Sequence, residues 1–265
     1  MNIVFAVLVL GVLGAVFGLV LAVASKIFEV ETDPRLEGVV ECLPGANCGG
    51  CGFAGCEAYA KAICAGEAEI GLCNAGGADA AAKISAIMGV DAVSVTRTVA
   101  FVKCSGGCVG QKADYYGIAD CSAAIRVPGS GLPLCTTACL GFGNCAKACQ
   151  FDAMHIVDGV AKVDPEKCTG CLACADACPR KLIVARPYDS KYAVACASKD
   201  KGAVTRANCS TGCIGCKLCE KSCENDAVHV DGNLAAIDFG KCVSCGACAE
   251  KCPRKVITDF SGKAG

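Results

Sequence analysis

The residues with the clearest chemistry in this chain are its 27 cysteines, most of which lie in closely spaced runs toward the C-terminus. The run Cys213-x2-Cys216-x2-Cys219-x3-Cys223 is followed by Cys242-x2-Cys245-x2-Cys248-x3-Cys252-Pro253. With this spacing, three thiolates of one run hold a [4Fe–4S] cube, and the fourth cysteine of each run ligates the other cube. The pattern predicts two clusters, whose ligand sets are Cys213, Cys216, Cys219 and Cys252, and Cys223, Cys242, Cys245 and Cys248.

Other uses of cysteine fit the composition less well. Disulfide frameworks are typical of short secreted domains, whereas this chain has 265 residues and an odd number of cysteines. Zinc sites are tetrahedral and use separated pairs, not three cysteines within seven residues. The formal net charge is −1 and there are two histidines. We therefore expect an iron–sulfur protein with no nucleic-acid partner and no catalytic residue of its own.

A shift of 74 residues superimposes two copies of the C-terminal region. Such a period indicates duplication of a whole structural unit. Each copy predicts a ferredoxin-like domain with two clusters and a β-hairpin that turns at Asp-Gly. The shift places one set of eight cysteines on another: Cys135, Cys139, Cys145, Cys149, Cys168, Cys171, Cys174 and Cys178 on Cys209, Cys213, Cys219, Cys223, Cys242, Cys245, Cys248 and Cys252.

The first copy departs from the pattern at one position, because Phe142 stands where the second copy has Cys216. Cys135, four residues before Cys139, is the nearest cysteine that could supply the missing ligand. The alternative is a three-iron cluster or no cluster. Cys209 is then spare, and Cys196 has no assigned role. The expected ligand sets are Cys135, Cys139, Cys145 and Cys178 for one cluster, and Cys149, Cys168, Cys171 and Cys174 for the next.

An earlier segment has a different cysteine spacing, Cys48-x2-Cys51-x4-Cys56-x16-Cys73. Its glycines permit the tight backbone that wraps a cube. We expect a separate domain with one [4Fe–4S] cluster, held by these four cysteines, and helices over 57–65 and 78–88. Two further cysteines lie outside the pattern and are expected to be structural thiols: Cys42 and Cys64.

The segment 91–133 contains a β-branched stretch, which predicts one or two strands, followed by Cys104, Cys108 and Cys121. These three cysteines could belong to a sixth cluster whose fourth ligand comes from elsewhere. The alternative is that they are thiols packed at strand ends, and they are not among the expected ligands.

The N-terminal segment from Ile3 to Ala24 contains no charged or polar side chain. A helix of this length, at about 1.5 Å per residue, crosses the hydrocarbon layer of a bilayer. A cleaved signal peptide is the alternative. However, no basic residue precedes the apolar stretch, and Lys26 follows it. We expect a single-pass cell-membrane anchor with the cluster domains on the cytoplasmic side.

The predicted fold class is therefore α+β, in five parts. Residues 1–25 are the transmembrane anchor and 26–90 the single-cluster domain. Residues 91–133 are connecting strands and loop. Residues 134–190 and 191–265 form the two tandem ferredoxin-like domains.

This ordered combination, with its two ferredoxin-like regions and Phe142, resembles the B subunit of the Rnf complex over essentially the whole chain, in the form found in anaerobic bacteria. The resemblance implies a subunit that accepts electrons from soluble ferredoxin in a complex that reduces NAD+ and translocates Na+ or H+. It implies, as partners, the lipid bilayer and the other membrane and flavin-bearing subunits. The alternatives are a free-standing membrane-anchored polyferredoxin and an electron-supply subunit of another membrane reductase.

Overall fold

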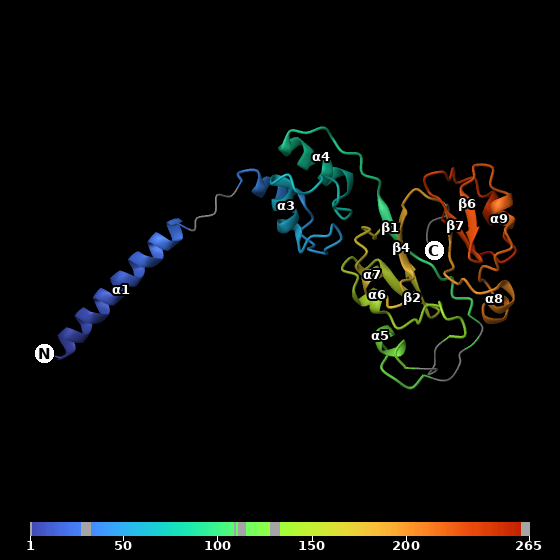
Figure 1. The fold of residues 1–265 in the computed structure, drawn as a ribbon, viewed down its shortest axis with the longest axis horizontal. Coiled ribbons are helices and arrows are strands. Elements are labelled where there is room, and N and C mark those ends of the chain that lie inside the picture. Colours follow the sequence, from blue (N-terminus) through green and yellow to red (C-terminus); the bar gives the residue numbers. More distant parts are fainter. Residues whose placement is uncertain (1, 28–32, 109, 111–114, 128–132, 261–265) are drawn as a thin grey trace.

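The computed structural model describes residues 2–27, 33–108, 110, 115–127 and 133–260. Its elements form an N-terminal helix, a small helical unit, and two units of short strands and short helices (Figure 1). The mixture of helices and antiparallel strand pairs agrees with the expected α+β class.

Helix α1 (Asn2–Ile27) covers the apolar N-terminal segment, as expected. The structure describes its side chains at Phe5, Leu8 and residues 10–24, and the large apolar ones among them are exposed, Leu10 by 70% and Leu21 by 68%. Over the described residues alone, no helix is both long and apolar enough to cross a membrane. The helix is therefore confirmed, whereas the membrane span remains an expectation.

The helical unit packs three helices around a small apolar core: α2 (Leu36–Cys42), α3 (Cys56–Cys64) and α4 (Gly77–Met88). Val39, Tyr59 and Ile84 are almost fully buried in this core. Helices α3 and α4 confirm the two helices expected from the sequence. Cys42 and Cys64 pack against the same core, in agreement with a structural role for both.

The first ferredoxin-like unit contains two antiparallel strand pairs. The elements of the unit are β1 (Thr98–Val102), α5 (Cys121–Ala124), α6 (Asn144–Lys147), β2 (Met154–Val157), β3 (Val160–Val163), α7 (Ala173–Asp176) and β4 (Ile183–Pro187). The first strand pairs with the last, Val102 opposite Ile183, and β2 pairs with β3. Strand β1 lies in the segment expected to be a connection. Its pairing with β4 places it in the sheet of the first unit.

The second unit repeats this arrangement with β5 (Tyr192–Val194), α8 (Gly202–Asn208), α9 (Leu218–Lys221), β6 (Val228–Asp231), β7 (Leu234–Ile237), α10 (Ala247–Glu250) and β8 (Ile257–Asp259). Here too the first strand pairs with the last, and a hairpin lies between them. The shared topology supports the internal duplication that the cysteine pattern predicts.

The two hairpins turn at equivalent positions, although not at the same residue types. The first turns at Asp158–Gly159, as expected, with both φ angles positive. The second turns at Gly232–Asn233, one residue later than the expected Asp231-Gly232. A two-residue turn of this hand needs positive φ at both positions, which Gly and Asn tolerate. Each turn therefore occupies the same position within its copy of the repeat, even though only the first copy has Asp-Gly there.

Candidate iron–sulfur centres

The helical unit brings the cysteines of its predicted site together. Cys48, Cys51, Cys56 and Cys73 line one small cavity. The Tyr59 hydroxyl donates to the Glu69 carbonyl (2.9 Å) and accepts from the Leu72 N–H (3.1 Å). Because these bonds hold the segment that precedes Cys73, they place the most distant of the four cysteines at the cavity.

Sequence reasoning missed Asn47 at this site. Its Oδ1 accepts a hydrogen bond from the Cys56 N–H (2.8 Å), and its φ is +47°. The bond ties the loop that carries Cys48 to the start of α3. The available signal was an asparagine among glycines, since Asn tolerates positive φ and bonds to nearby backbone groups.

In the first ferredoxin-like unit, the four cysteines of the regular run are brought together. Cys149, Cys168, Cys171 and Cys174 line one cavity. The Ala153 N–H donates to Cys149 Sγ (3.4 Å) and the Ala100 N–H to Cys168 Sγ (3.3 Å). Burial, and to a smaller extent the neighbouring thiols, raise the pKa of the Cys174 thiol to about 12. Iron bound to such a thiol removes its proton outright.

The irregular site of the same unit differs from expectation. Its cavity is lined by Cys121, Cys139, Cys145 and Cys178, and Cys135 is not among the lining residues. Burial, together with the neighbouring thiols of Cys139, Cys178 and Cys121, raises the pKa of Cys145 to about 11. Cys121, from the segment before the repeat, is therefore the fourth cysteine at this cavity, where Cys135 was expected.

Local hydrogen bonds hold Cys121 in this position. Asp120 caps α5 by accepting from the Ala123 N–H (2.8 Å), and Asn144 Nδ2 donates to the Asp120 carboxylate (2.7 Å). Asn144 Oδ1 accepts from the Cys121 N–H (2.9 Å). Since Asn144 immediately precedes Cys145, these hydrogen bonds hold the start of α5 against the start of α6, beside the cavity.

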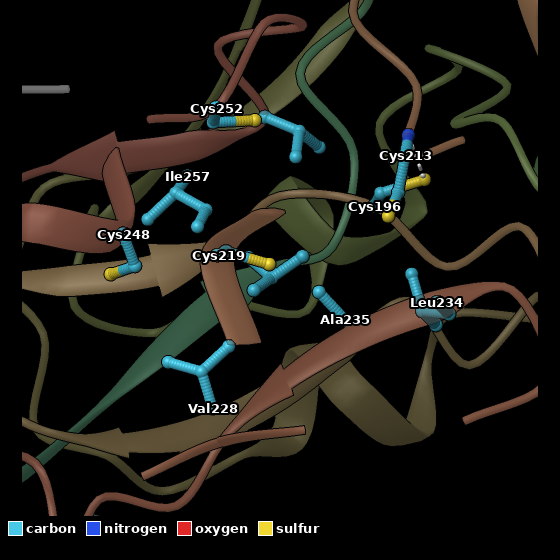
Figure 2. Packing of buried hydrophobic residues seen from close by; sticks show 11 residues of the cluster. Cys196, Cys213, Cys219, Val228, Leu234, Ala235, Cys248, Cys252 and Ile257 are labelled. Carbon is cyan, nitrogen blue, oxygen red and sulfur yellow. Dashed lines mark hydrogen bonds between the residues drawn. The ribbon is translucent and has the colours of Figure 1, made fainter. Parts of the chain in front are cut away.

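The second unit also brings together the cysteines of its two predicted ligand sets. Cys213, Cys216, Cys219 and Cys252 line a cavity. Burial raises the pKa of Cys248, and the thiols of Cys242, Cys245 and Cys223 raise it further, so the other four also lie together. Figure 2 shows Cys213, Cys219, Cys248 and Cys252 within the buried cluster of this unit. The clusters would thus be part of the hydrophobic core.

These sites fit [4Fe–4S] clusters better than single metal ions. All 27 cysteines are free of disulfides. Among the described residues, no three Cys, His, Asp or Glu side chains converge closely enough to hold one ion. A cube binds each thiolate through a different iron, so its ligands surround an inorganic core instead of meeting at a point. Four thiols around each cavity, with backbone N–H groups directed at sulfur, match that requirement.

Comparison with known proteins agrees with these sites. Three family models match the chain: "Putative Fe-S cluster" over residues 43–74, "4Fe-4S binding domain" over 161–184, and "4Fe-4S dicluster domain" over 212–257. They coincide with the cavity of the helical unit and with parts of the two ferredoxin-like units.

Curated relatives extend the similarity to nearly the whole chain. One is the B subunit of the Na+-translocating ferredoxin:NAD+ oxidoreductase complex of Acetobacterium woodii, 46% identical over 94% of this chain and 76% of the relative. The B subunit of the proton-translocating complex of Clostridium ljungdahlii is 43% identical, over 97% and 93%. The B subunit of the ion-translocating oxidoreductase complex of Methanosarcina acetivorans is 41% identical, over 95% and 96%. The chain belongs to the family of Rnf B subunits.

In this member of the Rnf B-subunit family, the helical unit and the first ferredoxin-like unit meet at Cys171. This cysteine lines both the cavity of its own unit and the cavity of the helical unit. A Cβ on Gly50 would lie 2.7 Å from the Cys171 carbonyl oxygen, so only glycine fits there. Asn74 Nδ2 donates to the Gly170 carbonyl beside it (3.4 Å). Two predicted centres are therefore in direct contact through one ligand.

Proposed function

We propose that this chain is the electron-entry and electron-transfer subunit of a membrane complex that oxidises reduced ferredoxin, reduces NAD+ and couples the reaction to Na+ or H+ translocation. The observation that carries the proposal is the series of cysteine-lined cavities, two of which share Cys171. The names of the relatives from A. woodii and C. ljungdahlii supply the reaction.

The chain holds at least five [4Fe–4S] clusters in this proposal. Cys121 replaces Cys135 in one ligand set, because the cavity of the irregular site is lined by the former. The five sets are Cys48, Cys51, Cys56 and Cys73; Cys121, Cys139, Cys145 and Cys178; Cys149, Cys168, Cys171 and Cys174; Cys213, Cys216, Cys219 and Cys252; and Cys223, Cys242, Cys245 and Cys248.

The clusters supply one-electron redox chemistry, and the protein tunes it. Backbone N–H groups donate to ligand sulfurs, for example Gly76 to Cys73 (3.3 Å) and Ala227 to Cys223 (3.3 Å). Such bonds stabilise the extra negative charge of the reduced state and raise the reduction potential, whereas burial opposes that charge and lowers it. The chain needs no acid–base pair, since no bond to hydrogen is made or broken on it.

Helix α1 is the membrane anchor in this proposal. Its described apolar side chains are exposed, and a lipid bilayer is the surroundings in which such a helix is stable. Lys26 follows the apolar segment, which favours the cytoplasmic side for the cluster domains. The flavins, the nicotinamide site and the ion path belong to partner subunits, and soluble ferredoxin is the electron donor.

The experiment is iron and sulfide analysis of the full-length chain purified without oxygen, followed by EPR during stepwise reduction with reduced ferredoxin. We expect at least about twenty irons per chain, from four per cube in five cubes, and reduction of clusters by ferredoxin. A value near eight irons would refute the tandem assignment. Clusters that dithionite reduces and ferredoxin does not would refute the electron-entry role.

A further inference from the structure

The two ferredoxin-like units pack closely along a seam, meaning here the contact between residues 101–108 and residues 193–213. Phe101, Ala193 and Ala195 are buried together. Ser105 Oγ donates to the Ala195 carbonyl (3.2 Å), and the Ser210 N–H donates to the Gly107 carbonyl (2.7 Å). The seam is therefore defined by specific hydrogen bonds.

Seven cysteines remain after the five ligand sets are assigned. Two of them, Cys42 and Cys64, pack in the helical unit. Of the other five, Cys104, Cys108, Cys196 and Cys209 lie in the two segments of the seam, and Cys135 comes from outside them.

Two of these five are equivalent in the repeat. Cys135 and Cys209 each place Sγ near a threonine hydroxyl two residues later, at 3.4 and 3.7 Å. An equivalent arginine binds the carbonyl of each, Arg180 at Cys135 and Arg254 at Cys209. The two copies thus present the same cysteine in the same setting.

A second equivalent pair is not visible in the sequence, because the first copy carries an insertion. Cys104 follows β1, and Cys196 follows β5. Cys104 Sγ accepts from the Cys139 N–H (3.4 Å), and Cys196 Sγ accepts from the equivalent Cys213 N–H (3.5 Å). Figure 2 shows Cys196 beside Cys213. The four cysteines are therefore related by the symmetry of the repeat.

These pairs meet across the seam. Burial raises the pKa of Cys104, and the nearby thiols of Cys139 and Cys135 raise it further. Burial also raises the pKa of Cys196, and the thiols of Cys213 and Cys135 add to it. Cys135 thus lies near a cysteine of each copy. The fourth cysteine reaches the same region because Cys209 forms an antiparallel bridge with Cys108.

We infer that Cys104, Cys135, Cys196 and Cys209 hold a sixth [4Fe–4S] cluster at the seam, with two ligands from each ferredoxin-like unit. Cys108 is left out, because its thiol donates to the Gly110 carbonyl (3.4 Å) and it has no counterpart in the second copy. The inference rests on the proposed cluster-carrying function. It adds a site that belongs to neither unit alone.

The surroundings suit an anionic cluster. The Arg180 guanidinium is close enough to Cys135, Cys139 and Cys104 for their charges to favour its protonated form, although burial lowers its pKa. Cys139 and Cys213 line the nearest cavities of the two units. Since their N–H groups donate to Cys104 and Cys196, the seam site adjoins a centre on each side and would carry electrons between the units.

Native mass spectrometry of the full-length chain, released from detergent without oxygen, counts the clusters as whole numbers. We expect six in the wild-type chain and five in the C196A/C209A variant. The C42A/C64A variant is the matched control, with the same number of thiols removed, and should retain six. In parallel, EPR of the fully reduced chain should lose about one spin per chain in C196A/C209A, because each reduced cube carries one unpaired spin.

A second pair of variants covers the case in which C196A/C209A does not fold. The single variants C104A and C108A should differ, with cluster loss in C104A and six clusters in C108A. Five clusters in the wild-type chain, or six in C196A/C209A, would overturn the inference, as would loss in C108A with retention in C104A. Five clusters with intact reduction by ferredoxin would leave the proposed function standing. Six clusters that ferredoxin cannot reduce would overturn only that function.

Discussion

The two ferredoxin-like units surround equivalent cavities with cysteines from different parts of the chain. In the second unit, Cys213, Cys216 and Cys219 line the cavity from one short run. In the first unit, Phe142 interrupts the run, and Cys121 reaches the cavity from a separate capped helix. The difference teaches that four cysteines can surround a cavity without all being neighbours in sequence.

The insertion that supplies Cys121 has a defined size. Cys104 and Cys139 are 35 residues apart, whereas their counterparts Cys196 and Cys213 are 17 apart. The first copy thus has 18 additional residues, since 35 minus 17 is 18. Phe142 packs instead on Tyr115, with ring centroids 5.3 Å apart. The insertion that carries Cys121 therefore also carries Tyr115, the aromatic residue on which Phe142 packs.

The largest effects are expected from removing the two ligands that occupy equivalent places. C121A and C216A should each lose about four irons per chain, or about one iron if a three-iron cluster persists. The reason is that each variant leaves a cube with three thiolates. Iron analysis with EPR measures both outcomes, and C64A is the control. A C121A chain with full iron content would show that Cys121 is not a ligand.

A rescue variant sharpens the same comparison. Phe142→Cys in the C121A background should restore the lost irons, because it recreates the regular run of the second unit. The corresponding variant in the wild-type background, F142C alone, should leave the iron content unchanged. Failure of the double variant to regain iron, in a chain whose other clusters are intact, would mean that residue 142 does not face the cavity.

A smaller effect is expected from the bonds that position Cys121. Asn144→Ala removes two hydrogen bonds, to the Cys121 N–H and to Asp120, each of which contributes about 1 kcal/mol to stability. We expect faster loss of one cluster to an iron chelator, with the other clusters unaffected. Leu218 stands at the equivalent place in the second unit and is 46% exposed, so L218A is the control. Equal chelation rates in both variants would contradict the positioning role.

The smallest effect is expected where the two units are alike at the surface. Lys167 pairs with Asp152 (2.8 Å), and Lys241 pairs with the equivalent Asp226 (3.2 Å). All four side chains are at least half exposed, and such pairs contribute little to stability because solvent screens them. K167A and K241A should each leave the iron content and the thermal unfolding midpoint unchanged. A clear fall in either midpoint would show that the ion pair contributes to the stability of its unit.

Much of this architecture could be predicted from the sequence. The spacing of cysteines such as Cys48, Cys51 and Cys56 determines local backbone geometry, so those sites follow from the pattern. The repeat also predicts both hairpins. The predicted register of the second turn is wrong by one residue, because Asp231-Gly232 and Gly232–Asn233 are both acceptable turn sequences and only strand pairing distinguishes them.

The features that sequence reasoning misses depend on contacts between distant segments. Cys121, and not Cys135, lines the cavity of the irregular site, because proximity in sequence is not proximity in space. The equivalence of Cys104 and Cys196 is hidden by the insertion, which breaks the constant shift of the repeat. Strand β1 belongs to a sheet and not to a connection, because it pairs with β4 at the other end of the first unit. No local pattern carries this information.

The pairing of first and last strands in each unit has a consequence for biogenesis. Strand β1 can find β4, and β5 can find β8, only after every residue between them has left the ribosome. Contacts of such long range are slow to form. Each unit therefore closes its sheet only after its last strand has been synthesised, so the thiols between the two strands are brought together late.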